Sequence, residues 1–217
     1  ENTAAVLLET IQGGAGFILP RENYLKKVKK RCEAVGALLL LDEIQPGFGR
    51  TGKMFGFENF DVVPDIIVMG NALGGGLPIG AFSASKKLMV KFEDEPKLGH
   101  ITTFGGNPVV ATSALTTINE IVSTKLIQQI ANKEKIFKKN LNHPLIKKIQ
   151  GKGLMLAPIF ENPEIPNYLV SRCIEKGLLL FWLLWEKNAI RISPPLNISE
   201  EEIVMGCHII KESLDEI

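Results

Sequence analysis

Unbroken runs of apolar residues alternate with amphipathic segments up to about residue 85. Four of these runs have the length of strands and are bounded by turn residues: 4–10, 37–44, 65–70 and 79–85. A strand that is apolar at every position is buried on both faces, which is typical of a parallel sheet covered by its crossover segments. Between the first two runs, apolar residues recur at helical spacing from Pro20 to Gly36, so this segment predicts a crossover helix.

The pattern changes after Pro108, where a long helical stretch begins. Beyond that stretch we predict short strands and two more helices: strands at 153–160, 177–182 and 189–193, helices near 164–176 and 199–216. The chain is therefore predicted to be α/β, with a boundary near residue 125. Residues 1–125 would form part of a larger domain with a mostly parallel sheet, and residues 126–217 a smaller α+β domain.

Composition and charge exclude several classes of protein. The 217 residues are 45% hydrophobic and 23% charged, with a formal net charge of +1, so nothing suggests a nucleic-acid or anionic-membrane partner. The longest apolar run, 177–185, is too short to span a membrane. The three cysteines form no CxxC pair and the three histidines have no metal-ligand spacing. We therefore expect reduced thiols, no metal site and a cytoplasmic location.

One candidate for chemistry stands at the end of a buried apolar run. Asp42 follows four leucines, and open α/β sheets place ligand sites at the carboxyl ends of their strands. A carboxylate buried there needs a partner, because burying it unpaired is unfavourable. A helix cap or a structural salt bridge would satisfy it equally well. Gln45 follows closely, and Pro46 with the glycine-rich turn behind it holds the amide near the same edge.

A second candidate is the glycine-rich stretch MGNALGGGLPIG, residues 69–80. A predicted strand ends at Gly70, and the consecutive glycines allow a sharp turn and a close approach of the backbone to a ligand. No Gly-Lys-Ser/Thr follows, so this is not a nucleotide P-loop. Together with Asp42 and Gln45 on the neighbouring strand end, the turn predicts a ligand site.

These stretches resemble the class III (ornithine and acetylornithine type) aminotransferases, fold-type I enzymes that use pyridoxal 5'-phosphate. The resemblance extends over essentially the whole chain, and its blocks occur in the family's order: LLETIQGGAG, LLLLDEIQPGFGRTGKMFGFE, PDIIVMGNALGGGLPIGAFSAS, HITTFGGNPVVATSAL and IRISPPLNIS. It implies transfer of an amino group from an amino acid or ω-amino acid to a 2-oxo acid. It also implies a homodimer with shared active sites.

The resemblance assigns roles to five side chains. Asp42 matches the aspartate that keeps the pyridine nitrogen of the cofactor protonated, so that the ring accepts electrons. Ile44 matches the residue that packs on one face of the ring, and Gln45 matches the donor to its phenolic oxygen. Thr103 matches the threonine that reaches the cofactor phosphate of the neighbouring subunit. Arg191 matches the arginine that binds the substrate α-carboxylate, for which a guanidinium has suitable geometry.

Asn71 departs from the family. Its position matches the lysine that holds the cofactor as a Schiff base and moves the proton during the reaction. An amide does neither, so we expect transamination to be lost or very slow, since general acid–base catalysis alone contributes about 10²–10⁴-fold. An introduced substitution, a natural non-catalytic relative and a sequence error all remain open as its origin.

Two other departures bear on function. Gly14 stands where ornithine-type members commonly carry a glutamate, which argues against ornithine specificity. The chain also begins at Glu1, close to its first strand, so it reads as the C-terminal half of something longer. Two alternative functions therefore remain: a non-catalytic pseudoenzyme of the same fold that binds a partner, and a relative of the glutamate-semialdehyde aminomutases.

Overall fold

The computed structural model describes residues 2–94 and 99–217. Its backbone divides into two compact units, each assembled from separate parts of the chain. The first unit comprises Glu1–Thr10, Arg21–Phe48 and Phe55–Thr124, and the second comprises Ile11–Pro20, Gly49–Met54 and Lys125–Ile217.

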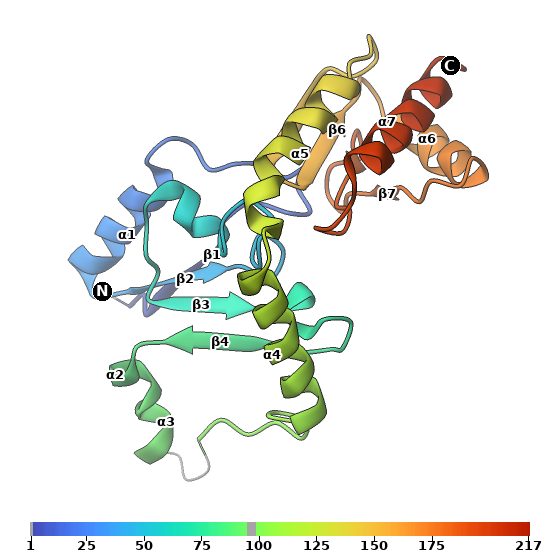
Figure 1. The fold of residues 1–217 in the computed structure, drawn as a ribbon. Coiled ribbons are helices and arrows are strands. Elements are labelled where there is room, and N and C mark those ends of the chain that lie inside the picture. The colour runs from blue at the N-terminus through green and yellow to red at the C-terminus, as the bar shows by residue number, and fades with distance from the viewer. Residues whose placement is uncertain (1, 95–98) are drawn as a thin grey trace. The chain divides into compact units, whose positions relative to one another are not determined.

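The first unit contains a four-stranded sheet and its connecting helices (Figure 1). The strands are β1 (Ala5–Glu9), β2 (Leu38–Asp42), β3 (Ile66–Met69) and β4 (Ala81–Ala84). The α-helices are α1 (Tyr24–Val35), α2 (Lys86–Met89), α3 (Lys91–Asp94) and α4 (Pro108–Ser123). The short 3₁₀ helices are η1 (Gly56–Phe60) and η2 (Asn71–Gly74).

The sheet has the order β1-β2-β3-β4, and its strands are mostly parallel, as the apolar runs predict. β1, β2 and β3 run in the same direction, whereas β4 is antiparallel to β3. The reason lies in the connection lengths. A parallel crossover needs a dozen or more residues, and only the short glycine-rich segment separates β3 from β4. The mostly parallel α/β architecture is thus confirmed, with one antiparallel strand at an edge.

The core of the first unit lies between α1 and the sheet. It is formed by apolar side chains that are at most 9% exposed: Leu25, Cys32, Ala37, Leu39, Leu41, Phe57 and Val62. Helix α1 begins at Tyr24 rather than at Pro20, because Asn23 before it has a left-handed backbone with φ 58°. It ends as predicted at Gly36, which also adopts the left-handed conformation, φ 73°, common at helix C-termini.

The second unit contains two small antiparallel sheets and three helices. The strands are β5 (Lys148–Lys152), β6 (Met155–Ile159), β7 (Phe181–Trp182) and β8 (Ile190–Arg191). The helices are α5 (Leu126–Asn140), α6 (Glu164–Glu175) and α7 (Glu200–Leu214). Strand β5 was not predicted, because its sequence KIQGK has no apolar run. Helix α7 opens with a capping box in which Ser199 Oγ accepts from Glu202 N at 3.1 Å.

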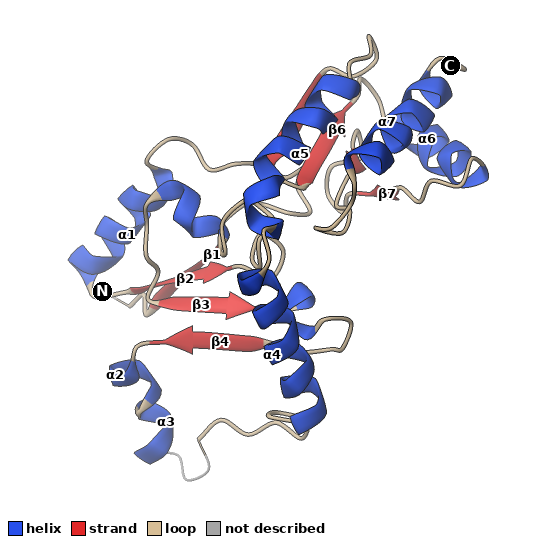
Figure 2. Ribbon diagram, in the orientation of Figure 1, coloured by secondary structure: helices blue, strands red, loops and turns tan. Residues whose placement is uncertain are grey.

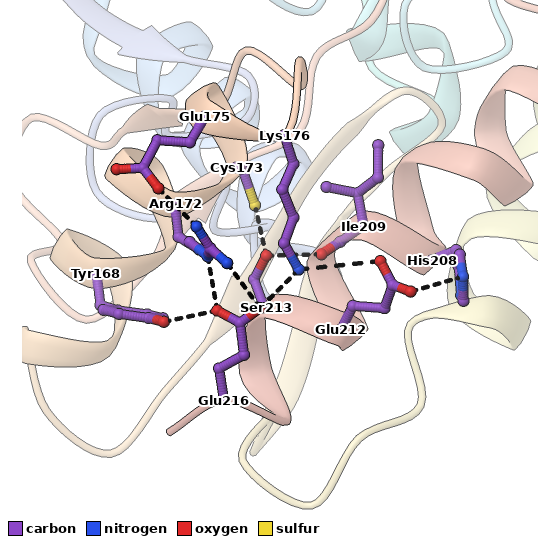
Figure 3. A network of polar contacts seen from close by, with 10 residues as sticks. All are labelled: Tyr168, Arg172, Cys173, Glu175, Lys176, His208, Ile209, Glu212, Ser213 and Glu216. Atoms are coloured by element: carbon purple, nitrogen blue, oxygen red, sulfur yellow. Dashed lines mark hydrogen bonds and ion pairs between the residues drawn. The ribbon is translucent and has the colours of Figure 1, made fainter.

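Helices α6 and α7 lie side by side (Figure 2), over a continuous apolar core shared with α5, β6 and β8. Just after α7, the carboxylate of Glu216 accepts hydrogen bonds from three side chains (Figure 3). Arg172 Nε donates to Glu216 Oε2 at 2.6 Å, Tyr168 OH donates to the same oxygen at 2.8 Å, and Lys176 Nζ lies 2.9 Å from Oε1. This network ties the end of the chain to α6.

Three general expectations concern the chain as a whole. Cys32, Cys173 and Cys207 are free and buried. No helix in the described part of the chain is long and apolar enough to cross a membrane. Among the described residues, no group of three or more histidine, cysteine, aspartate or glutamate side chains has the geometry of a metal site.

Candidate cofactor site

Asp42 is the last residue of β2, in the middle of the sheet. Its Cα partners are Glu9 on β1 and Val68 on β3. The half-buried carboxylate accepts a hydrogen bond from its own turn, Ile44 N to Asp42 Oδ1, at 2.9 Å. Within the described residues, no lysine or arginine forms an ion pair with it. Among the described residues the structural salt bridge that the sequence left open is therefore not found, and the printed hydrogen bond engages one of the two carboxylate oxygens.

The turn after Asp42 carries Ile44 and Gln45, both half-buried. Ile44 packs against the end of β3: a methyl group at Gly70 would lie 3.5 Å from Ile44 Cγ1. The contact joins the ends of two neighbouring parallel strands. The carboxyl ends of β2 and β3 therefore carry Asp42, Ile44 and the residue that follows Gly70 on the same side of the sheet.

Asn71 is the residue that follows Gly70, and it begins η2 with an exposed side chain. Its φ is 45°, in the left-handed region, where asparagine is enriched among residues other than glycine. Gly75 ends η2 in the same region, φ 57°, with Thr117 Oγ1 2.2 Å from where a Cβ would stand. The turn at Gly75 thus requires glycine both for its backbone conformation and for its packing against α4.

An open cavity of about 980 Å³ lies beside Asn71 in the first unit. It is lined by Asn71, Gly76, Leu77, Pro78, Ile79, Gly80, Phe104, Asn107 and Val110. Asn107 caps α4 by accepting from Val109 N at 3.0 Å and Val110 N at 3.3 Å, and Ser113 Oγ donates to Gly74 O at 2.8 Å. The Asn107 bonds cap α4, and the Ser113 bond joins α4 to η2 beside the cavity.

Thr103 lies in the turn that precedes α4, directly before the cavity residue Phe104. Its side chain is exposed, and Phe104 is 82% exposed. The turn is therefore exposed next to the cavity, and Thr103 itself does not line it.

Glu43 was not singled out from the sequence, yet it is 0% exposed and forms the densest polar contacts near the site. Thr10 Oγ1 donates to Glu43 Oε1 at 2.6 Å, Gly56 N donates to Oε2 at 2.6 Å, and Phe57 N donates to Oε1 at 2.8 Å. Burial raises the pKa of Glu43, while these three donors oppose the increase. Two consecutive carboxylates at the end of an apolar strand were the available signal, because alternation places one of them on each face.

Arg191 belongs to the second unit, where it forms half of β8. Its guanidinium carbon lies 5.3 Å from the centroid of the Phe181 ring, a cation–π geometry. Two cations hold the loop after β8: Arg50 Nη1 donates to Pro194 O, and Lys133 Nζ donates to Leu196 O at 2.7 Å. Burial lowers the pKa of Arg50 to about 10. Arg50 is thus structural, and within the described residues Arg191 has no carboxylate partner.

Gly14 also lies in the second unit, directly beneath an indole ring. Trp185 N donates to Gly14 O at 2.8 Å, and a Cβ at position 14 would stand 2.8 Å from Trp185 Cδ1. Any larger residue at position 14 would have to displace Trp185, which is 80% exposed. The observed position of Trp185 therefore requires a glycine at position 14.

Comparison with known proteins gives consistent results. A family model described as "Aminotransferase class-III" matches residues 1–214. Putrescine aminotransferase from Pectobacterium atrosepticum is 40% identical, over 99% of this chain and 47% of its own length. Acetylornithine aminotransferase from Caldanaerobacter subterraneus is 38% identical, over 100% of this chain and 55% of its own.

A solved structure of ornithine aminotransferase from Toxoplasma gondii is 31% identical, with a TM-score of 0.90, over 100% of this chain and 51% of that one. It is described as having partial occupancy of pyridoxal phosphate at its active site. The chain thus spans about half the length of the curated relatives it matches.

Proposed function

This chain belongs to the class III aminotransferase family, and on that premise we propose that it forms the part of an aminotransferase that binds the ring of pyridoxal 5'-phosphate. The reaction would move an amino group from an amino acid or ω-amino acid to a 2-oxo acid. Class III aminotransferases use this cofactor. When bound, it supplies an electron-accepting ring that stabilises negative charge at the substrate carbon.

The arrangement of Asp42 supports this proposal most directly. The carboxylate stands at the carboxyl end of a parallel strand with one oxygen bonded to Ile44 N and no ion pair among the residues described. A protonated ring nitrogen is a suitable partner for such a group, because a charge-assisted hydrogen bond offsets the desolvation of the carboxylate. The residues present thus fit the cofactor at its nitrogen.

The other site residues would bind and orient the ring. Ile44 offers an apolar surface next to Asp42, and Gln45 offers an amide that donates to the phenolic oxygen. Thr103, exposed before α4, would donate its hydroxyl to a phosphate held by a second copy of the protein, and this role requires a homodimer. Arg191 would bind the substrate carboxylate. We assign residues 1–125 to the cofactor domain and 126–217 to the small domain of a cytoplasmic enzyme, except that the segments Ile11–Pro20 and Gly49–Met54 belong to the second compact unit.

Asn71 limits what the site can do. Its amide is neither a nucleophile nor a base at neutral pH, so the cofactor would be held without a covalent bond and proton transfer would be slow. This observation favours a second candidate function, a non-catalytic subunit of the same fold. The two candidates share cofactor binding and differ in turnover.

Titration of the purified chain with pyridoxal phosphate tests the proposal. We expect a saturable change in visible absorption and no adduct after borohydride reduction. Binding should be roughly 10- to 100-fold weaker in Asp42→Asn, which removes a charge-assisted hydrogen bond worth about 1.5–3 kcal/mol. Asn71→Lys serves as the control, since its amine should give an adduct at residue 71 on reduction.

Two results would contradict the proposal. One is the absence of saturable binding in both the unsubstituted chain and Asn71→Lys. The other is a reducible adduct at an existing lysine of the unsubstituted chain. Turnover of amino donors by Asn71→Lys but not by the unsubstituted chain would favour an aminotransferase scaffold with a substituted lysine over a dedicated non-catalytic subunit.

A further inference from the structure

Glu43 connects three segments that are distant in the sequence. Thr10 follows β1, Glu43 follows β2, and Gly56 and Phe57 begin η1. All three donors reach the same carboxylate at 2.6–2.8 Å, in a position with no solvent exposure. Among the described residues, no lysine or arginine is paired with it. In the part of the chain that the structure describes, its side-chain hydrogen bonds come from one hydroxyl and two peptide groups.

The backbone of Glu43 fixes the same turn from the other side. Glu43 N donates to Val68 O on β3 at 2.8 Å, and Gly47 N donates to Glu43 O at 3.0 Å. A Cβ at Gly47 would lie 2.5 Å from that carbonyl oxygen, so only glycine fits. The turn between Glu43 and Gly47 is thus held at its first residue by the side chain and at its last by the backbone.

This turn carries the residues proposed to contact the cofactor ring. Ile44 and Gln45 lie within it, and Asp42 precedes Glu43 on the opposite face of the strand. A rotation of the peptide between residues 43 and 44 would break the Ile44 N to Asp42 Oδ1 bond of 2.9 Å. The orientation of the Asp42 carboxylate thus depends on the conformation that Glu43 imposes.

We propose that Glu43 is a positioning residue: through Thr10, Gly56 and Phe57 it sets the geometry of the 42–47 turn, and so the direction in which Asp42, Ile44 and Gln45 meet a ligand. Glu43 itself touches no ligand. The part of this inference that concerns pyridoxal phosphate rests on the proposed function, whereas the part that concerns the turn does not.

Glutamine at position 43 is a sharp test because it keeps the shape of the side chain. Gly56 N and Phe57 N can only donate, and each points at a different carboxylate oxygen. Glutamine has one acceptor oxygen and one NH₂ group, so in either orientation one peptide N–H faces another donor. Glu43→Gln should therefore release one side of the turn without creating a cavity.

Two measurements on the full chain follow the effect. Amide hydrogen exchange at Ile44 and Gly47 reports on the turn without any cofactor, and we expect at least about tenfold faster exchange in Glu43→Gln. Titration with pyridoxal phosphate should show about tenfold weaker binding and a changed absorption band for the bound cofactor. Thr10→Ser, which keeps the hydroxyl, should behave as the natural chain, and Thr10→Val should be intermediate.

Leu39→Ala is the matched control for general destabilisation. Leu39 lies on β2 with 0% exposure and its side chain forms no polar bonds, so its loss weakens the unit without touching the turn. Measurements are made at urea concentrations that give both variants the same unfolding free energy. If Glu43→Gln then matches Leu39→Ala in exchange at Ile44 and Gly47 and in the band of bound cofactor, the inference is overturned.

The remaining outcomes separate the two proposals. If neither the unsubstituted chain nor Asn71→Lys binds pyridoxal phosphate but Glu43→Gln still accelerates exchange selectively in the turn, the positioning role stands and the proposed function fails. If the cofactor binds and Glu43→Gln changes neither affinity, absorption nor exchange, the proposed function stands and the positioning role fails.

Discussion

The side chain at position 71 affects both the stability of the turn and the chemistry that the site can perform. A φ of 45° is unfavourable for most side chains by roughly 1–2 kcal/mol, and asparagine is among the few that tolerate it. The same backbone would be strained with lysine, the residue that the resemblance to the family leads us to expect at this position. With asparagine the turn is therefore more stable, but the chain lacks the amine.

We expect Asn71→Lys to lower the unfolding free energy by about 1 kcal/mol, measured by urea denaturation without cofactor, because lysine does not tolerate the left-handed backbone as asparagine does. Asn71→Ala is the matched variant, since it carries the same strain and no amine. It should lose as much stability as Asn71→Lys and give no borohydride adduct. Equal stability of all three proteins would disprove the strain argument.

At the scale of elements, helices α6 and α7 are joined in two different ways. Their buried faces contribute Leu169, Val170, Cys173, Cys207 and Ile210 to one apolar core. They are also joined by polar contacts, through the three side chains that donate to Glu216. Arg172 binds this carboxylate through two nitrogens, and together with Lys176 and Tyr168 it lowers the pKa of Glu216 to about 2.

This pKa predicts how stability changes with pH. Since the pKa of Glu216 is about 2 in the folded protein against an ordinary 4.5, its stabilisation is complete above pH 4.5 and disappears as the pH falls toward 2. Glu216→Gln should therefore unfold at a lower temperature than the natural chain at pH 7, and the difference should shrink steadily below pH 4.5. The readout is the midpoint of thermal unfolding across this pH range.

Glu175→Gln is the control for the pH series. Glu175 accepts one bond, from Arg172 Nη1 at 2.7 Å, on the exposed side of α6. Its removal should change the unfolding midpoint much less than the removal of Glu216, because an isolated exposed ion pair contributes little. A pH-independent difference between Glu216→Gln and the natural chain would contradict the assignment.

At the scale of the molecule, the chain has two units with separate apolar cores. The first core contains Cys32, which is 2% exposed, and the second contains Cys173 and Cys207, both 0% exposed. Burial also raises the pKa of Cys173 and raises that of Cys207 to about 12. Each thiol should react with an alkylating reagent only when its own unit opens.

Alkylation during denaturation tests this assignment of the cysteines. Leu39→Ala removes a fully buried side chain from the first core, which should lower the stability of that unit by about 2–5 kcal/mol. Cys32 should then react at a lower denaturant concentration, with a larger shift than Cys173 and Cys207 show. Leu154→Ala, in the second core, should produce the opposite order. Equal shifts of all three thiols in both variants would show that the two cores open as one.

The sequence alone determined the class of fold and the family, because apolar runs, helical spacing and motif order are local properties of the chain. It also placed Asp42 at a strand end and Gly36 at the end of a helix. The functional roles given to Asp42, Ile44, Gln45, Thr103 and Arg191 stay predictions, since they depend on a ligand. The tertiary structure decided the contacts between distant segments.

Three such contacts illustrate the reason. Thr10 and Glu43 are 33 residues apart, and nothing in either neighbourhood indicates their 2.6 Å bond. Trp185 covers Gly14 only because the two segments pack together in the second unit. Strand β4 is antiparallel because a short connection leaves no room for a crossover. Local pattern sets which elements form, whereas side-chain pairing and strand direction depend on how the folded chain brings those elements together.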